Sequence, residues 1–202
     1  WENHIGRSLP YWKNNFSVLK SYFPEELSNV NYKSFYQACN NVKPSLIRTN
    51  ADELTYHLHV LIRYEIEKGL IEGNINVDEL PSVWNNLYKK YLDIDVPSDS
   101  LGVLQDIHWS HGSFGYFPTY TLGSFYAAQF YNQASSEISN INSKMENGDT
   151  KELLEWLRNN IHRHGERYDA KDLCKRITGE ELNFKYFMDY AKSKYSKIYN
   201  LD

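Results

Sequence analysis

The stretch from Gly102 to Tyr120 gathers side chains that could do chemistry. It holds an amide at Gln105, a carboxylate at Asp106, two imidazoles and two phenols, with glycines and a proline between them. Such side chains can grip a polar substrate or donate hydrogen bonds to a developing oxyanion. The stretch therefore predicts one wall of an active or binding site. The alternative is a buried polar turn whose groups only satisfy backbone atoms. The imidazoles and phenols belong to His108, His111, Tyr116 and Tyr120.

A second candidate is Arg48, which lies between Ile47 and Thr49 just ahead of a predicted long helix. A guanidinium matches a carboxylate with two parallel hydrogen bonds, so an arginine here could bind a carboxylate ligand. The competing interpretation is a structural ion pair with Asp52 or another acidic group. The residue types alone leave both interpretations open.

The seven histidines do not form a recognisable metal site. A catalytic zinc helix carries the pattern His-Glu-x-x-His, which the sequence lacks. His57 and His59 are two residues apart on a predicted helix, where their side chains diverge by roughly 200°. Histidine pairs more often serve structure than metal binding, so we expect no metal ligand in this chain. The other pairs are His108 with His111 and His162 with His164.

The composition describes a globular chain without the electrostatic signature of nucleic-acid binding. Its 202 residues are 41% hydrophobic and 15% aromatic, which is enough for a substantial core. The net charge is -4 and no basic stripe stands out. No apolar run is long enough to span a membrane and no secretory leader is visible. Cys39 and Cys174 predict reduced thiols in a cytoplasmic protein.

Hydrophobic spacing predicts a mainly α fold, with one short strand over residues 45–49. Asn50 and Glu53 form a pattern typical of a capping box, so a long helix is expected to begin at Asn50. We treat residues 1–202 as a single helical domain. The predicted helices span residues 9–23, 24–42 with looser spacing, 50–73, 77–92, 117–145, 150–164, 170–178 and 184–199.

Two motifs carry a resemblance to a known family. Ile47-Arg-Thr-Asn-Ala-Asp52 resembles Ile-Arg-x-x-Ala-Asp, and Gly102-Val-Leu-Gln-Asp-Ile-His-Trp109 resembles Gly-x-x-Gln-Asp-x-His-Trp. Both are motifs of the carboxypeptidase Taq family of zinc metallocarboxypeptidases, and they occur in the expected order. The resemblance runs along essentially the whole chain.

The resemblance implies a mostly helical, saddle-like, grooved enzyme of the zincin type. Such enzymes are usually homodimers and remove single residues from peptides with a free C-terminus. The family holds zinc with a His-Glu-x-x-His helix and a Glu of a later His-Glu-Ser-Gln segment, and neither motif occurs here. The chain begins at Trp1 and so resembles the C-terminal portion of such an enzyme. We expect this fragment alone to bind no zinc and to be inactive.

The resemblance also implies roles for individual residues. Arg48 matches the anchor for the substrate's C-terminal carboxylate, and His108 matches a substrate-binding group. Gln105 lies in the same motif, where it serves substrate binding or the position of its loop, as does Asp106. A looser similarity to related oligopeptidases implies that His111, Tyr116 and Tyr120 stabilise the tetrahedral intermediate. Which phenol donates to the oxyanion stays open.

Two other functions fit the same residues. The chain could be a noncatalytic helical module that binds peptides without cleaving them, or part of an endopeptidase of the same superfamily. An endopeptidase would not depend on Arg48, because an internal peptide bond offers no carboxylate to it.

Overall fold

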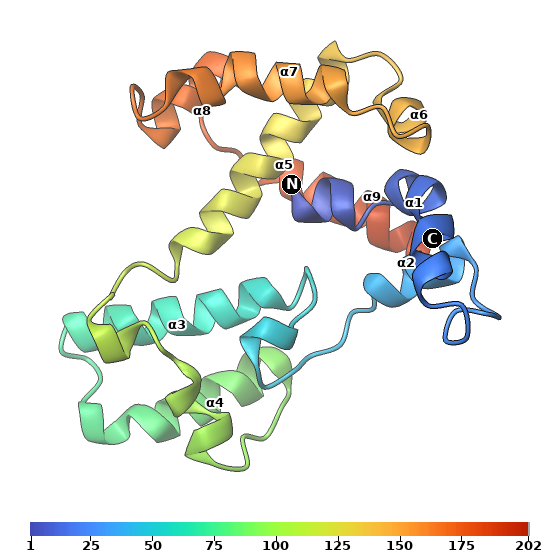
Figure 1. Ribbon diagram of the computed structural model, residues 1–202. Coiled ribbons are helices and arrows are strands. Elements are labelled where there is room, and N and C mark those ends of the chain that lie inside the picture. Colours follow the sequence, from blue (N-terminus) through green and yellow to red (C-terminus); the bar gives the residue numbers. More distant parts are fainter. Residues whose placement is uncertain (202) are drawn as a thin grey trace. The chain divides into compact units, whose positions relative to one another are not determined.

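The computed structural model describes residues 1–201, which form helices joined by turns and loops, with no strand among them. The mainly α prediction is confirmed (Figure 1). No helix in the described part of the chain is long and apolar enough to span a bilayer. The α-helices are α1 (Leu9–Tyr22), α2 (Tyr32–Cys39), α3 (Tyr56–Ile71), α4 (Leu80–Leu92), α5 (Thr119–Glu137), α6 (Ile141–Glu146), α7 (Lys151–Asn160), α8 (Ala170–Thr178) and α9 (Lys185–Tyr199). A π-helix covers Glu2–Gly6, and short 3₁₀ helices cover Arg48–Asn50, Val77–Glu79, Asp99–Leu101, Val103–Gln105, Trp109–His111 and His162–His164.

The chain divides into two compact units. One is continuous in sequence and comprises residues 41–123; we call it the contiguous unit. The other, the split unit, joins residues 1–40 to the part of the chain from Ser124 onward. The division falls within α5, after Gly123. Each unit is described by itself.

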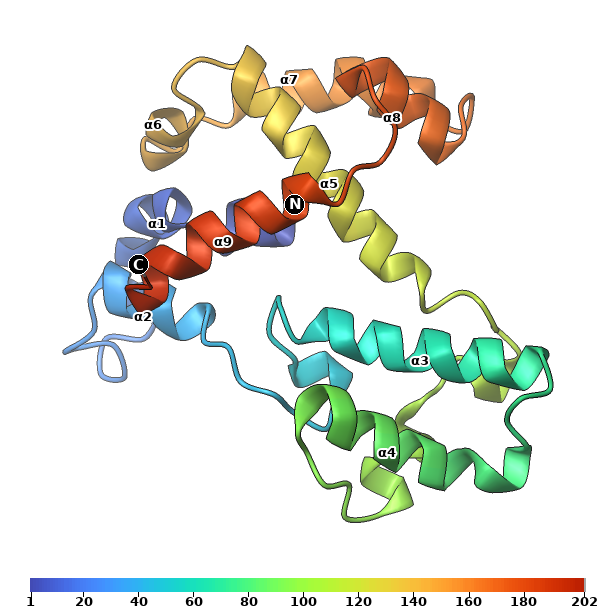
Figure 2. The same cartoon turned by 180° about the vertical axis from the view of Figure 1, so that it is seen from behind.

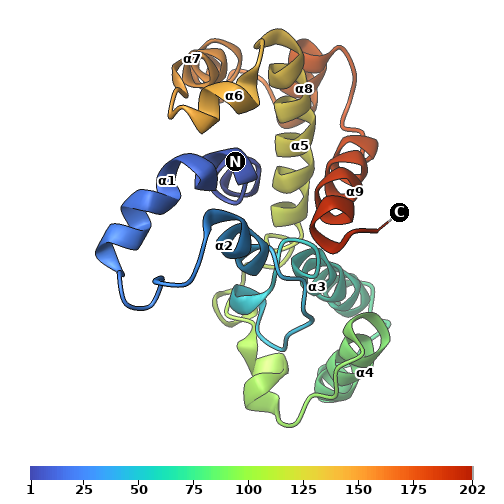
Figure 3. The ribbon, with the colours of Figure 1, turned by 90° about the vertical axis from the view of Figure 1, so that its right-hand side faces the viewer.

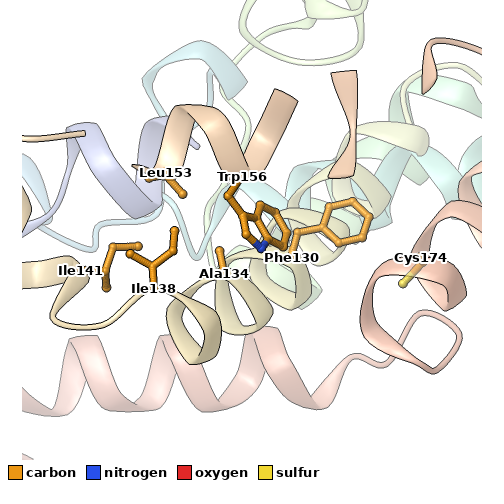
Figure 4. Packing of buried hydrophobic residues seen from close by; sticks show 7 residues of the cluster. All are labelled: Phe130, Ala134, Ile138, Ile141, Leu153, Trp156 and Cys174. Carbon is orange, nitrogen blue, oxygen red and sulfur yellow. The ribbon is translucent and has the colours of Figure 1, made fainter. Parts of the chain in front are cut away.

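The split unit packs α5, α7 and α8 around a core that includes Trp156 (Figure 4). The helices pack there because their apolar residues recur at three- and four-residue steps, which places them on one face. The indole nitrogen of Trp156 donates to Glu137, so the one polar atom of this large side chain has a partner. The buried members of the cluster are Phe130, Ala134, Ile138, Ile141, Leu153, Trp156 and Cys174.

The amino-terminal helices of the split unit begin at side-chain caps. The Ser8 hydroxyl accepts from the Tyr11 amide ahead of α1, with proline in the first turn. Asn31 accepts from the amides of Lys33 and Ser34 at the start of α2. Helix α1 packs against α2 and α6 (Figure 3). The prediction of helix over residues 24–42 is right only for α2, because turns occupy residues 24–29.

In the contiguous unit, α3 and α4 lie side by side (Figure 2). Ile62 and Ile66 of α3 are fully buried against Trp84 and Tyr88 of α4. The two rings of α4 stack with centroids 4.9 Å apart. This two-helix core is the platform from which the loops before α3 and after α4 are held.

Three sequence predictions about these elements are wrong. The expected strand over residues 45–49 is a bend followed by a 3₁₀ helix, because the contiguous unit offers no neighbouring strand to pair with. Asn50 does not begin a helix, because α3 starts at Tyr56 without a side-chain cap; in the turn just ahead of it, the Asp52 carboxylate accepts from the amides of Leu54 and Thr55, each at 2.9 Å. The expected helix over residues 117–145 is interrupted after Glu137, since Asn140 adopts a left-handed conformation with φ of 57°.

Candidate functional site

Asp52 fixes the segment that carries Arg48. Besides the two amides in the turn just ahead of α3, its carboxylate accepts from the Lys43 amide at 2.9 Å and from the Thr55 hydroxyl at 2.6 Å. These bonds tie the chain before Arg48 to the helix after it. They also engage the carboxylate fully, so the alternative that Asp52 forms an ion pair with Arg48 is wrong.

Arg48 is half-buried, and no carboxylate within residues 1–201 lies at ion-pair distance from it. Its guanidinium carbon lies 5.0 Å from the centre of the Phe117 ring. Burial raises the pKa of the neighbouring Tyr56 phenol, and the positive charge of Arg48 partly offsets that rise. Arg48 thus presents a positive charge beside aromatic rings and a phenol, with no acidic partner from this part of the chain.

The loop after α4 turns sharply at Gly102. A β-carbon at this position would lie 2.7 Å from Val96 Cγ1 and 3.1 Å from the Ser98 carbonyl oxygen. No larger residue fits without displacing the backbone of residue 98. The glycine that opens the motif is therefore required by space.

Asp106 holds the next part of this loop from inside. One of its oxygens accepts from the amides of His108 and Trp109, at 2.8 and 3.0 Å. The other accepts from Nε of Arg63 on α3 at 2.7 Å, in an ion pair whose two side chains are fully buried. Arg63 lies between the rings of Trp84 and Phe117, with its guanidinium carbon 4.6 Å from each centre. Asp106 is therefore a structural residue of the loop.

Glu67, one turn further along α3, holds the loop at two more points. Its carboxylate accepts from the Trp109 indole nitrogen and from the Gly115 amide, both at 2.8 Å. Residues 110–114 therefore form a loop whose two ends are both bonded to Glu67. Gly115 has φ of 78°, a left-handed conformation that glycine adopts at little cost.

The closed loop brings aromatic side chains together around His108. The His108 ring is buried and stacks on Tyr116 at 5.7 Å, and it meets Phe117 at 5.1 Å and Tyr120 at 6.0 Å between ring centres. Tyr116 and Tyr120 contact each other edge to face, and both are exposed. Of the residues predicted from the sequence, His108, Tyr116 and Tyr120 thus form one cluster.

The cluster favours a neutral His108 imidazole beside a protonated Tyr120 phenol. Burial lowers the pKa of His108, and the positive charge of Arg48 adds to this, while Asp106 opposes it. Partial burial and the neighbouring Tyr116 raise the pKa of Tyr120. The His108 Nδ1 atom is buried and has no hydrogen-bond partner within residues 1–201. At neutral pH the phenols can donate and the imidazole can donate or accept, depending on its tautomer.

The sequence matches a known protein family. The sequence pattern of the carboxypeptidase Taq (M32) metallopeptidase family matches residues 1–195. The chain belongs to this family. Three comparisons show known proteins that are similar to this chain in sequence, two of them solved structures that also share its fold.

Carboxypeptidase 1 of Bacillus subtilis (strain 168) is 42% identical over 201 residues, which are 100% of this chain and 40% of that protein. The crystal structure of an M32 carboxypeptidase from Deinococcus radiodurans R1 matches with a TM-score of 0.97 and 39% identity, over 100% of this chain and 41% of that one. A solved structure described as that of CHT matches with a TM-score of 0.93 and 56% identity, over 96% of this chain and 39% of that one. The chain thus spans about two fifths of the length of these relatives.

Membership of the carboxypeptidase Taq family implies a divalent metal, and the residues described do not fit one. Within residues 1–201, no group of three or more His, Cys, Asp or Glu side chains is placed to hold a metal ion. His57 pairs with the Thr121 hydroxyl and His59 with the Tyr88 hydroxyl, at 2.9 and 3.0 Å.

We call the aromatic side chains around His108 the ring cluster. Two residues predicted from the sequence do not belong to it: Gln105 lies apart from it and His111 lies at its edge. The Gln105 amide donates to the Ser100 carbonyl, which fixes the preceding turn. His111 is exposed, with Nδ1 2.9 Å from the Ser113 hydroxyl, and its ring centre is 5.8 Å from that of His108.

Sequence reasoning missed Arg63, Glu67 and Tyr56. Arg63 and Glu67 are four residues apart on a helix, a spacing that normally indicates an exposed ion pair. The signal that could have found them is their place among the apolar residues Ile62 and Ile66, which puts charged groups next to the buried face.

Proposed function

We propose that this chain is part of a metallocarboxypeptidase that removes single residues from peptide C-termini, and that residues 41–123 bind the substrate's C-terminal end. Family membership supports the class of enzyme. The observation that carries the role of this unit is Arg48, a half-buried arginine without a carboxylate partner in the described part of the chain. A buried cation usually has an anionic partner, and a substrate carboxylate would supply one.

In this proposal, Arg48 binds the free carboxylate and selects exopeptidase substrates. An internal peptide bond would cover the half-buried guanidinium without supplying a negative charge to pair with it, which is unfavourable. His108 binds the same end of the substrate. Tyr116 and Tyr120, with His111 at the edge, provide donors for the oxygen that becomes negative in the tetrahedral intermediate. Gln105 supports the turn from which this loop departs.

The binding role can be tested on the 202-residue chain itself. We expect a short peptide with a free C-terminal carboxylate to bind more tightly than the same peptide with a C-terminal amide, by calorimetry or NMR titration. Arg48→Ala should remove this preference and weaken carboxylate binding about 10- to 100-fold, the range for a hydrogen bond to a charged group. Arg48→Lys should restore it in part, because lysine keeps the charge but not the forked geometry.

The matched control is Arg163→Ala, which removes an exposed arginine from the split unit. It should leave both affinities unchanged. Equal binding of carboxylate and amide by the unaltered chain, or an equal loss in both arginine variants, would contradict the anchor role. The homodimeric state and cytoplasmic location implied by the family resemblance remain predictions for the parent protein.

A further inference from the structure

Three buried polar residues follow one another along α3 at one-turn intervals. His59 and Arg63 are completely buried and Glu67 is 4% exposed. Charged side chains are almost never buried in this way unless they are paired. His59 connects to the segment before α3, whereas Arg63 and Glu67 hold different points of the loop after α4. We call them the α3 stripe.

His59 connects to the segment that carries Arg48. Its Nδ1 lies 3.0 Å from the Tyr88 hydroxyl, and that hydroxyl donates to the Leu46 carbonyl at 3.3 Å. Because the tyrosine proton goes to Leu46, Nδ1 of His59 must carry the proton of the first bond. The chain of bonds ends two residues before Arg48.

Arg63 and Glu67 connect to the loop that carries the ring cluster. Arg63 holds Asp106, which in turn holds the amides of residues 108 and 109. Glu67 holds the Gly115 amide, immediately before Tyr116. The hydrogen bonds that start from the three members of the α3 stripe therefore lead to positions close to Arg48, to His108 and to the residue before Tyr116.

Stability alone does not account for the charges of the α3 stripe. Apolar residues of similar volume often replace buried ion pairs with no loss of stability. An apolar side chain at position 67 could fill the space but could not hold the amide of Gly115. The charged side chains therefore serve to fix the backbone of the loop after α4. A loop ordered before binding also loses less conformational entropy when the ligand arrives.

We propose that the α3 stripe positions the two ligand-binding segments of the contiguous unit, with Glu67 as the positioning residue for the phenol-bearing loop and Tyr88 as the link to the Arg48 segment. What these segments bind rests on the proposed function. That the stripe fixes them can be measured without any ligand.

The first measurement is amide hydrogen exchange in the unaltered chain. Gly115 lies in an exposed loop, yet its amide should exchange more slowly than those of Phe114 and Tyr116, for which residues 1–201 provide no acceptor. Glu67→Gln turns one acceptor oxygen into a donor group. It should accelerate exchange of Gly115 about tenfold or more and shift the indole resonance of Trp109.

Glu65→Gln is the matched control on the same helix. Glu65 also accepts from an aromatic side chain, the Tyr91 hydroxyl at 2.6 Å, but it does not touch the loop. Glu65→Gln should leave Gly115 exchange unchanged. Equal exchange rates at Gly115 in the two variants, or fast exchange in the unaltered chain, would overturn the role of Glu67.

The ligand-binding arm separates this proposal from the proposed function. Glu67→Gln should weaken binding of carboxylate and amide peptides alike, about tenfold, and keep their ratio, because Arg48 is held elsewhere. Tyr88→Phe should reduce the ratio of carboxylate-peptide to amide-peptide affinity and leave the exchange rate of the Gly115 amide unchanged. If the unaltered chain shows no carboxylate preference, the proposed function fails, whereas the exchange data still decide whether Glu67 fixes the loop. A reduced ratio in Glu67→Gln with an unchanged ratio in Tyr88→Phe would overturn the assignment of the two segments.

Discussion

Asp106 shows how one carboxylate can hold a loop. It accepts two backbone amides with one oxygen and pairs with the fully buried Arg63 through the other. The motif around it also contains Gln105 and His108, and the sequence could not divide the binding and structural roles among them. The division follows from burial, because Asp106 faces inward while Gln105 is bonded to a surface turn.

We expect Asp106→Asn to lower the free energy of unfolding by about 3 to 5 kcal/mol, since it leaves the charge of Arg63 buried without a counterion. Denaturant unfolding measures this. The control is Asp99→Asn, at an exposed position of the same loop, with an expected change within about 0.5 kcal/mol. A loss below about 1 kcal/mol in Asp106→Asn would show that the pair is dispensable.

His59 should make stability depend on pH. Burial, with the nearby charge of Arg63, lowers its pKa from 6.5 to about 4. Between these values the unfolded chain takes up a proton that the folded chain does not. This contribution to stability is therefore present above pH 6.5 and is lost as the pH falls toward 4, with a slope of up to about 1.4 kcal/mol per pH unit.

His59→Gln removes this proton uptake, so its unfolding free energy should fall less steeply between pH 6.5 and 4 than that of the unaltered chain. Carboxylates titrate equally in both proteins, and the difference in slope isolates His59. Parallel pH profiles would contradict a buried, neutral His59.

At the scale of elements, the helices with regular apolar spacing were predictable. Helix α8 has the predicted bounds, and α1 and α9 differ from theirs by one residue. The start of α3 could not be predicted. Asn50 and Asp52 are both residue types that commonly begin helices, and the sequence does not show which one lies next to the helix. Residues 45–49, before α3, have the local pattern of a strand. A strand needs a neighbouring strand to pair with, and whether one is present depends on the fold of the whole contiguous unit.

The two capping candidates can be separated by mutation. Asp52→Ala should lower the free energy of unfolding by about 1 to 2 kcal/mol, because it leaves the amides that Asp52 holds ahead of α3 without their acceptor. Asn50→Ala is the matched control and should change it by less than about 0.5 kcal/mol. Similar losses in both variants would argue that the two residues share the role.

At the scale of the whole molecule, the family could be predicted from two short motifs, whereas the division into two units could not. Nothing in the composition changes at residue 41 or residue 123, and hydrophobic spacing continues through α5 across the boundary. Arg63 and Glu67 were missed for a related reason. Their partners lie more than forty residues away, with sequence separations of 43, 42 and 48.

We predict that the purified 202-residue chain binds no stoichiometric zinc and cleaves no peptide. The reason is that residues 1–201 offer no set of three or more metal-binding side chains in one place. Metal analysis after incubation with zinc and desalting, together with a peptide-release assay, tests this. One tightly bound zinc per chain, with cleavage that a chelator removes, would contradict it.

The split unit imposes an order on folding during synthesis. Residues 1–40 leave the ribosome before their partners in the second part of the split unit, because His4 packs on Tyr131 and Lys13 pairs with Glu146. At about 5 to 20 residues per second, the wait lasts on the order of 5 to 20 s. Every helix partner of α3 and α4 in the contiguous unit emerges during this interval. Residues 1–40 thus wait for their contacts with the rest of the split unit while the contiguous unit, which is made after them, is already complete.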